Sequence, residues 1–321
     1  MKNPSKLVIW FSVMLLSLIW GSTWLAIKIG LYDTPPIFSA ALRFIVASAF
    51  LIFYMKIKKI KFPVTLQYWK YSLFMALFMF MLPYGFVYWG EKYVSSGLSA
   101  VIFSSQSLFV IIFSQFFLKH EKATLLKIAG LFIGTLGLIY IFYSRFEIAE
   151  NYGLFGMAGI LLAAVSAAFA LVWLRMKGDK SDLITDLTSQ ICITALFFIL
   201  TSLCFEKFPA DISSPNLWLS VGYLAVIGTS ISFLIYYWLA KHTSALILSF
   251  SIYLTPVLAL FLGWFFLDEG IGTNDIIGTI IVITSIIIAQ SNKKLSFLPI
   301  FTIKLFNADR ETPVFEKLEY D

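Results

Sequence analysis

The sequence predicts an all-α integral membrane protein whose ten transmembrane helices form two inverted five-helix repeats. The first supporting observation is composition: 60% of the 321 residues are hydrophobic, 13% are charged, and the mean hydropathy is +0.87. A water-soluble domain of this length could not bury so much apolar surface in one core. The other two observations are ten long apolar runs and an internal similarity between the halves of the chain.

Each apolar run is long enough to cross a bilayer. A spanning helix needs about 20 mainly apolar residues, because the hydrocarbon layer is roughly 30 Å thick and a helix rises about 1.5 Å per residue. The runs are continuously apolar, which favours helices over the alternating strands of a barrel. The first run is too long for a secretory signal and lacks its cleavage site. In chain order, the ten runs cover residues 8–29, 36–56, 69–89, 96–118, 124–143, 152–175, 183–204, 217–239, 244–266 and 274–290.

Lysine and arginine predict the orientation of the chain. With the N-terminus in the cytoplasm, the outer side receives only Lys28, Lys92, Arg145 and Lys207, and most other basic residues lie inside. This distribution is the positive-inside pattern, so we expect a multi-pass protein of the cytoplasmic membrane with both termini in the cytoplasm. The net charge of +6 is spread over loops, which fits anionic lipid headgroups and argues against a nucleic-acid partner.

An internal repeat relates the two halves. The segment YWGEKYVSSGLSA resembles YWLAKHTSALILS, so that Trp89 aligns with Trp238. The similarity extends in both directions with slips of one or two residues, and it places Arg43 opposite Gln190. Because each copy contains five helices, an odd number, the second copy enters the bilayer from the opposite side.

The repeat divides the chain into residues 1–145, residues 146–290 and a cytoplasmic tail at 291–321. The apolar stretch of the tail, LSFLPIFTIKLF, is too short to span a bilayer. Two halves related by a two-fold axis in the membrane plane can rock in the same way, which makes inward-open and outward-open forms nearly equivalent. This arrangement predicts alternating access around a site near mid-bilayer, between the halves.

A family resemblance lies in the stretches WGSTWLAIKIG, PPIFSAALRFIVASAFLIF and GLSAVIFSSQSLFVIIFSQFFLKHEK, and in ALILSFSIYLTPVLALFLGWFFLDEG of the second half. Over about residues 8–290, the chain is similar to EamA-type members of the drug/metabolite transporter superfamily. The resemblance implies a secondary transporter that exports small amphipathic metabolites, such as amino acids, their derivatives or drugs, by alternating access. One departure is that Pro256 and Val257 of the second half have Leu108 as their counterpart in the first.

Polar and aromatic residues near the middle of the predicted helices are candidates for a substrate-binding site. Lipid offers polar groups no hydrogen-bond partners, so these side chains should face other helices or a wet cavity. The alternative is a packing role, with hydroxyls bonded to their own helix and glutamines to a neighbouring one. The candidates are Trp20, Arg43, Tyr84, Ser104, Gln106, Gln190, Tyr253 and Thr255. The expected cavity walls are the helices at 69–89, 96–118, 217–239 and 244–266.

Arg43 is the most informative single residue of the sequence. An arginine at the centre of a membrane helix costs about 3 kcal/mol on insertion scales, so some contact should offset that cost. The functional interpretation is an anion or carboxylate contact towards the outer end of the transport pathway. The alternative is a side chain that snorkels to the headgroups, or that pairs with Glu91 or a helix end.

Four residues are candidates for gating. Glu91 and Lys92 lie at the outer end of the third predicted helix, where they either gate the exit or form a solvated loop pair. Pro83 and Pro256 each remove one helical amide, which frees a carbonyl for a ligand or a water molecule.

Other chemistry finds no support in the sequence. It contains no HExxH, GxSxG or Walker A pattern, so we expect no catalytic residues, metal, cofactor or ATP-driven step. Glu121 and Glu269, which align in the repeat, are expected to cap or pair near helix starts. The expected partners are a small-molecule substrate and the lipid bilayer, and a homodimer is left open. The alternative function is a channel or a structural membrane protein without carrier activity; the inverted repeat favours a carrier.

Overall fold

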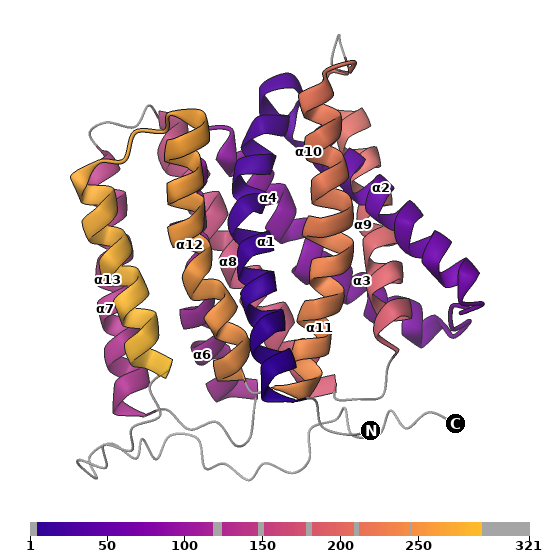
Figure 1. The fold of residues 1–321 in the computed structure, drawn as a ribbon, viewed down its shortest axis with the longest axis horizontal. Helices are drawn as coiled ribbons and strands as arrows, with labels where there is room; N and C mark the ends of the chain where they lie inside the picture. Colours follow the sequence, from indigo (N-terminus) through magenta and orange to yellow (C-terminus); the bar gives the residue numbers. More distant parts are fainter. Residues whose placement is uncertain are drawn as a thin grey trace. The chain divides into compact units, whose positions relative to one another are not determined.

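The computed structural model describes residues 5–117, 124–146, 151–177, 182–208, 212–243 and 245–290. Over these residues the chain is helical, without a β-strand, and its helices pack side by side (Figure 1). In chain order the elements are α1 (Lys6–Asp33), α2 (Pro36–Ile57), α3 (Leu66–Ala76), η1 (Leu77–Met81), α4 (Leu82–Glu91), α5 (Ser96–Ser104), α6 (Gln106–Phe117), α7 (Leu125–Phe146), α8 (Asn151–Lys177), α9 (Leu183–Phe205), α10 (Pro215–Ala225), η2 (Val226–Ile231), α11 (Ser232–His242), α12 (Ala245–Leu267) and α13 (Thr273–Gln290). The predicted tail at 291–321 and Glu121 lie outside the described residues.

The elements form ten spans. Three spans consist of consecutive segments, namely α3–η1–α4, α5–α6 and α10–η2–α11. Seven spans are long and apolar enough to cross a membrane, and three shorter apolar helices, within α7, α12 and α13, complete the set for the described residues. The predicted membrane all-α class with ten helices is therefore confirmed.

Local sequence explains several helix starts. The side-chain oxygens of Thr65, Asp182 and Ser214 each accept from a backbone amide three residues later, which satisfies an amide that has no partner within the helix. Pro36 and Pro215 stand at the first helical position, where the missing amide hydrogen removes no helical bond.

Helix pairing follows the repeat. The equivalent spans α2 and α9 pack against each other at one edge of the bundle, and α7 and α13 pack at the other (Figure 1). The contact of α1 with α12 has its counterpart in the contact of α8 with α5 and α6, and the contact of α4 with α8 has its counterpart in that of α1 with α10 and α11. Each half therefore covers the other with equivalent surfaces.

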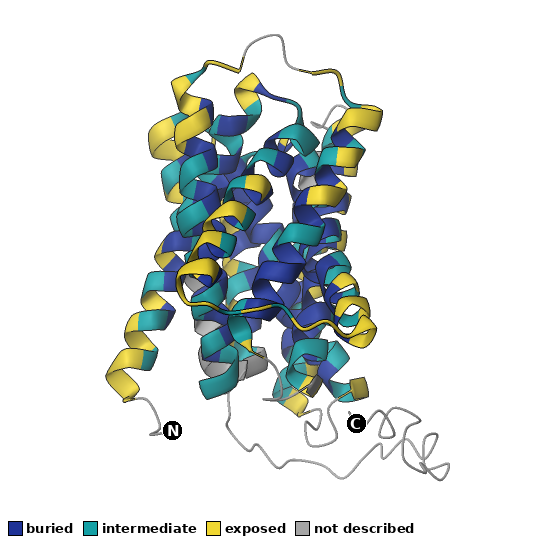
Figure 2. Cartoon of the chain, turned by 90° about the vertical axis from the view of Figure 1, so that its right-hand side faces the viewer, coloured by how far each residue is buried: buried dark blue, intermediate teal, exposed yellow. Residues whose placement is uncertain are grey.

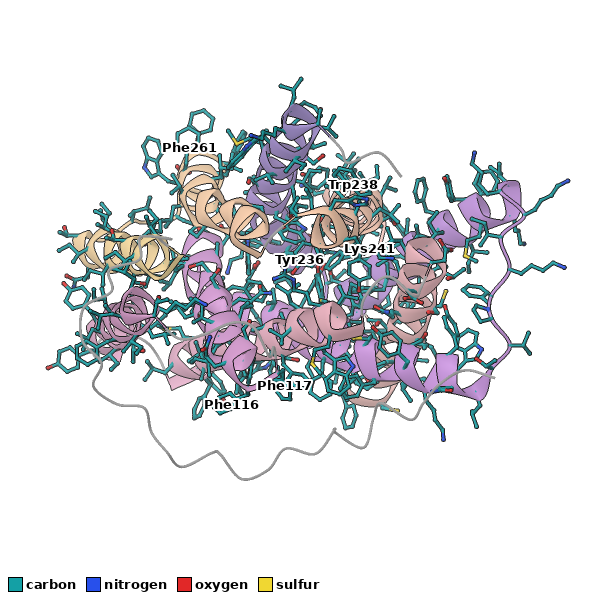
Figure 3. All side chains as sticks on the ribbon, turned by 90° about the horizontal axis from the view of Figure 1, so that it is seen from below. Phe116, Phe117, Tyr236, Trp238, Lys241 and Phe261 are labelled. Atoms are coloured by element: carbon teal, nitrogen blue, oxygen red, sulfur yellow. The ribbon has the colours of Figure 1, made fainter. Side chains whose placement is uncertain are left out.

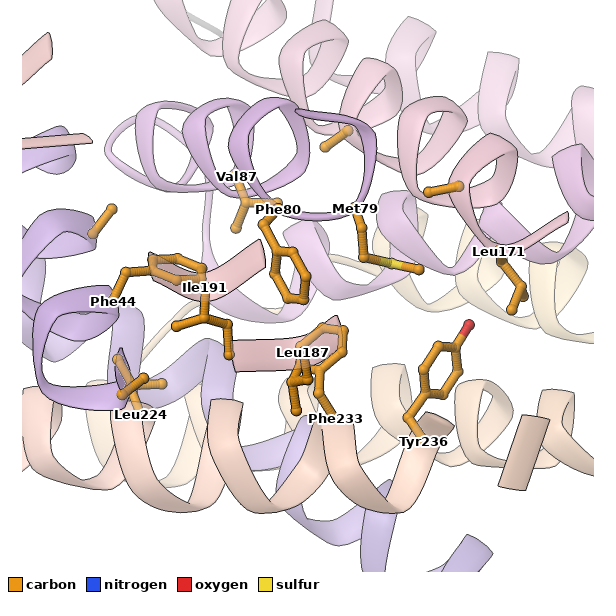
Figure 4. Close-up of a cluster of buried hydrophobic side chains, with 14 of the residues drawn as sticks. Phe44, Met79, Phe80, Val87, Leu171, Leu187, Ile191, Leu224, Phe233 and Tyr236 are labelled. Carbon is orange, nitrogen blue, oxygen red and sulfur yellow. The ribbon is translucent and has the colours of Figure 1, made fainter. Parts of the chain in front are cut away.

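The interior is mainly apolar and draws on both halves. Buried residues lie towards the centre of the bundle and exposed residues towards its outside (Figure 2). Many of the exposed residues are large and apolar, as expected where lipid replaces water as the solvent. Around the centre, Phe44 and Phe80 of the first half meet Ile191, Leu224 and Phe233 of the second (Figure 4). Tight packing of this kind holds the spans in fixed register around the site.

Two π-helical segments occupy equivalent places in the repeat. Val226, which begins η2, follows Leu77, which begins η1, by the same number of residues that separates Trp238 from Trp89. A π-helical turn contains one more residue than an α-helical turn and often marks a functional site. Both segments lie next to the cavity described below.

Candidate functional site

A cavity lies between the two halves of the bundle. Its volume is about 90 Å³, and its wall comes from α1, α2, η1, α4, α5 and α6 of the first half and from α8, α11 and α12 of the second. A volume of roughly 10–15 Å³ suffices for one water molecule, so the cavity can hold several waters or part of a small organic molecule. A site shared by the two halves is the arrangement expected of inverted repeats.

Many of the predicted site residues line this cavity. The structure brings together Trp20, Arg43, Pro83, Tyr84, Ser104, Gln106 and Thr255. Trp24, which the sequence places near mid-membrane with Trp20, also lines the cavity. Sequence reasoning missed Thr23, Phe233 and Tyr236, which line it as well. Helical periodicity could have found Thr23, because it follows Trp20 by three residues and shares its face.

The aromatic side of the cavity joins α1 to α11. The ring centroid of Trp20 lies 5.0 Å from that of Tyr236 and 5.8 Å from that of Phe233. Seen from below, Tyr236 lies within the bundle, whereas Phe116 and Phe261 lie at its periphery (Figure 3). Tyr236 is buried, and the other two are exposed. The aromatic wall is thus a feature of the interior and distinct from the lipid-facing rings.

Three predicted site residues stand elsewhere. Gln190 is buried between α9 and α11, where its Oε1 accepts from the Tyr237 hydroxyl at 2.8 Å, and it does not line the cavity. Pro256 is buried within α12, next to the lining residue Thr255. The side chain of Tyr253 lies outside the described residues.

The two charged gating candidates differ in surroundings. Lys92 is exposed, with its ammonium 5.6 Å from the centroid of the Tyr93 ring. Glu91 is fully buried, one helical turn beyond the lining residue Val87. They are therefore not a solvated pair, because only Lys92 faces outward.

Arg43 is held inside the protein by the other half of the chain. Its side chain is 1% exposed; Nε donates to Thr229 Oγ1 at 2.7 Å and Nη2 donates to the Gly228 carbonyl at 3.1 Å. Its Nη1 lies 3.5 Å from the Tyr88 hydroxyl, and its Cζ lies 4.6 Å from the centroid of the Tyr84 ring. The side chain therefore does not snorkel to the headgroups, and it forms no ion pair with a carboxylate in the described part of the chain.

The η2 segment supplies the acceptors for Arg43. The hydroxyls of Thr229 and Ser230 donate to carbonyls five residues earlier, at 2.8 and 2.9 Å, which satisfies acceptors in the wide π-helical turn. The Gly228 carbonyl also accepts from Ser232 Oγ at 2.8 Å. A side chain at Gly228 would collide with Thr23, since a Cβ there would lie 2.8 Å from its methyl group. Glycine thus lets α1 approach η2 closely.

The η1 segment is stabilised differently. Its backbone bonds span five residues, as in the bond from the Leu82 amide to the Leu77 carbonyl. Pro83 has no amide hydrogen, so the corresponding carbonyl, that of Phe78, lacks this partner. Ser166 of α8 donates to it at 2.9 Å. The carbonyl freed by Pro83 therefore has a protein partner, where sequence reasoning assigned it to a ligand or water.

Several polar contacts close the end of the bundle at which α4 ends and α5 begins, which we call the α4–α5 end. Lys28 Nζ of α1 donates to the backbone carbonyls of Glu91 at 2.5 Å and Val94 at 2.9 Å. Glu269, which follows α12, accepts from the Ser96 amide and hydroxyl, both at 2.8 Å. The expected role of Glu269 near a helix start agrees with this contact, because a carboxylate there satisfies free amides and the positive helix end.

A second carboxylate at this end was missed by sequence reasoning. Glu206, which follows α9, accepts from the amides of Ile37 and Phe38 at 2.8 and 2.7 Å, so it caps α2. Like Glu269, it belongs to the second half and caps a helix of the first. Nothing in the local sequence around Glu206 indicates a contact with a helix start that lies about 170 residues away.

Comparison with known proteins assigns this architecture to a family. The model of the EamA-like transporter family matches residues 7–143 and again residues 154–290, which together make up most of the chain. The chain belongs to the EamA-like transporter family. The family resemblance noted in the sequence is thereby confirmed.

Relatives of this EamA-like chain are also named as transporters. It is 30% identical to the uncharacterized transporter YoaV of Bacillus subtilis (strain 168), over 84% of this chain and 92% of that one. It is 28% identical to the uncharacterized inner membrane transporter YedA of Escherichia coli (strain K12), over 82% of this chain and 84% of that one. The chain also matches a solved crystal structure, with a TM-score of 0.66 and 19% sequence identity. The match covers 89% of this chain and 97% of the chain in that structure. At that identity the likeness shows the fold alone.

The family and these relatives indicate a multi-pass membrane transporter rather than an enzyme. Both segments matched by the EamA-like model contribute residues to the wall of the cavity. Among the described residues, no group of three or more histidine, cysteine or acidic side chains could hold a metal ion.

Proposed function

We propose that this EamA-like protein is a secondary transporter that exports small amphipathic metabolites, such as amino acids or their derivatives, across the cytoplasmic membrane by alternating access. The supporting observation is the cavity that both halves share, with an aromatic wall and a few convergent polar groups. Pockets of this composition bind small molecules that have one apolar and one polar part.

The chemistry of the wall suggests how such a molecule is oriented. Trp20, Trp24 and Phe233 offer an apolar surface, and Gln106 and Thr255 offer neutral polar groups. Arg43 adds a positive charge to the lining. A substrate with an anionic or carboxylate group would direct that group towards the guanidinium and its apolar part towards the indole rings.

Alternating access requires that the two ends of the pathway open in turn. From the positive-inside pattern we expect the α4–α5 end to face the outside. At this end Lys28 ties α1 to the end of α4 and to the loop before α5. Glu269, two residues after α12, is bonded to Ser96 at the start of α5. We therefore assign this conformation to a state that is closed towards the outside. Opening would break these contacts and expose the cavity on that side.

The test is transport by purified protein in proteoliposomes, with a panel of amino acids, amino-acid derivatives and other small metabolites. A carrier gives saturable flux that rises when unlabelled substrate is loaded on the opposite side. Gln106→Ala and Tyr84→Ala should each lower the flux without lowering the amount of protein in the membrane. Tyr143→Ala is the matched control, because Tyr143 is 75% exposed on the lipid side.

Two results would overturn the proposal. Flux that neither saturates nor responds to substrate on the opposite side would indicate a channel. Flux at the normal level in both Gln106→Ala and Tyr84→Ala would remove the cavity from the transport site.

A further inference from the structure

Glu91 has an environment unlike that of the other glutamates at the α4–α5 end. It is 0% exposed, and neither carboxylate oxygen has a hydrogen-bond partner among the described residues. Glu269 accepts from Ser96, and Glu206 caps α2. Of the glutamates that the structure describes, Glu91, Glu206 and Glu269 lie at this end of the bundle, and Glu91 is the one that is buried with no hydrogen-bond partner among the described residues.

The charged and titratable groups that face Glu91 are engaged elsewhere. Lys28 of α1 donates to two backbone carbonyls, one of them that of Glu91 itself. Arg43 of α2 donates hydrogen bonds to η2. The hydroxyl of Tyr88 of α4 faces the same guanidinium. Glu269, after α12, is bonded to the start of α5. Helix α8 approaches α4 through Gly156, whose carbonyl oxygen lies close to Gly90.

Burial of an ionised carboxylate without a partner is expensive. The penalty for burying an unpaired ion is much larger than that for burying an unpaired neutral polar group, because a full charge loses far more hydration free energy. The closed α4–α5 end therefore accommodates the neutral acid far better than the anion.

We propose that Glu91 is a proton-binding site, and that the α4–α5 end closes when its carboxyl group takes up one proton. In the open state, water reaches the carboxyl group, which releases the proton to the solution at that end and pairs as a carboxylate with the Lys28 ammonium. Closure reverses both steps: the proton returns to the carboxylate oxygen, and Lys28 moves back to the two carbonyls. Acid solution therefore favours the closed end and alkaline solution the open end.

The position of Glu91 links this proton to the cavity. Val87, one turn earlier on α4, lines the cavity, as does Trp24, one turn before Lys28 on α1. Residues one turn apart share a helix face, so a separation of α1 from α4 that opened the cavity would wet the carboxyl group as well. The inference rests on the proposed transport function only in treating the two states as steps of one cycle.

Infrared difference spectroscopy of the full-length protein in liposomes tests the bound proton directly. At neutral pH the wild type should show the C=O stretching band of a protonated carboxylic acid, and Glu91→Gln should lack its Glu91 component. Glu269→Gln and Glu206→Gln are matched controls. The side chains of Glu269 and Glu206 accept hydrogen bonds from backbone amides, so these two changes should remove carboxylate bands and leave the acid band. An acid band that Glu91→Gln leaves unchanged would overturn the proposal.

Accessibility tests the coupling to closure. In a background of Cys192→Ser and Cys204→Ser, Val94→Cys places a thiol at the closed end and Tyr32→Cys an exposed reference thiol. Taking the ratio of their alkylation rates removes the pH dependence that both thiols share, since the thiolate is the reacting form. This ratio should rise with pH, by at most about tenfold per unit for one proton. With Glu91→Gln the ratio should stay low and independent of pH.

The coupling would be overturned if the alkylation ratio changed equally with pH whether residue 91 is Glu or Gln. It would also be overturned if the ratio changed with pH in neither protein. If Glu91→Gln fails to fold, the pH dependence of the wild-type acid band decides the matter, since an acid that does not ionise when the Val94→Cys thiol becomes reactive cannot control closure. Neither measurement needs a substrate. A failure to find transport and a failure of this inference are therefore separate results.

Discussion

Arg43 and Gln190 align in the two repeats, yet they engage their surroundings differently. Each lies beside a tyrosine of the next span in its own half. Arg43 Nη1 lies 3.5 Å from the Tyr88 hydroxyl, and the Tyr237 hydroxyl donates to Gln190 Oε1 at 2.8 Å. Of the two, Arg43 also crosses to the other half, where it bonds to Thr229. Both repeats therefore keep a polar side chain next to a tyrosine, but only the first half has a charged side chain, Arg43, at that place.

The π-helical segments differ in the same sense. The place of Thr229 in η2 is taken in η1 by Phe80, which is buried in the apolar core. In η1 the spare carbonyl is that of Phe78, and it accepts from the neutral hydroxyl of Ser166. The same backbone irregularity is thus held by a cation in one half and by a serine in the other. Backbone geometry follows the repeat, whereas the polar chemistry beside the cavity is asymmetric.

The largest effect is expected from Arg43→Gln, which places the second-half residue in the first half. The change removes the donors to Thr229 and to the Gly228 carbonyl, and a hydrogen bond to a charged group contributes about 1.5–3 kcal/mol. We expect flux in proteoliposomes to fall at least about tenfold, the change in rate that 1.36 kcal/mol produces. The thermal unfolding midpoint in detergent should fall as well.

Arg43→Lys is the matched control for this prediction. Lysine keeps the charge but lacks the planar fork that bonds Thr229 and Gly228 together. Its flux should lie between those of the wild type and Arg43→Gln. Normal flux in Arg43→Gln would show that the asymmetry between the halves has no role in transport.

A smaller effect is expected from Thr229→Val. This change removes both the bond to the Leu224 carbonyl and the acceptor for Arg43 Nε. Leaving a buried donor or acceptor unpaired costs about 1–3 kcal/mol, so the unfolding midpoint should drop. Ser230→Ala removes only the bond to Ala225, and it should cost less. Equal losses in the two variants would mean that η2 is stabilised without help from Arg43.

The two tyrosine pairs allow a direct comparison of the halves. Tyr237→Phe removes a bond of 2.8 Å and leaves Gln190 without it, for an expected loss of about 1 kcal/mol or slightly more. Tyr88→Phe removes a contact of 3.5 Å, which is at the limit of a hydrogen bond, and should change the unfolding midpoint less. The reverse order would show that Tyr88 supports the charge of Arg43 more strongly than its distance indicates.

The smallest effect is expected at η1 and is best measured as a double-mutant cycle. Ser166→Ala removes the partner of the Phe78 carbonyl and should cost about 1 kcal/mol in the wild type. In a Pro83→Ala background the restored backbone amide can bond that carbonyl, so the same change should cost almost nothing. Additive losses would indicate that Pro83 and Ser166 act independently.

Hydropathy and charge alone determined much of this protein. The ten spans follow from the need of lipid-exposed backbone to satisfy its own hydrogen bonds, which makes long apolar helices the local solution for each segment. The five-helix repeat was also visible in the sequence, because the copies still share residues such as Trp89 and Trp238. Depth within a span, which is a local property, placed Trp20, Arg43 and Gln106 among residues that line the cavity.

Only the tertiary structure decided which groups meet. Arg43 lies 186 residues from Thr229, and Lys28 lies 63 residues from Glu91, and no local pattern records such pairs. The π-helical segments were hidden as well, since Leu77–Met81 and Val226–Ile231 read as ordinary helix and the extra residue per turn is stabilised by side chains from other helices. A sequence determines what each helix can bury. That Glu91 has no hydrogen-bond partner in the described part of the chain depends on where its neighbours from other helices place their polar groups.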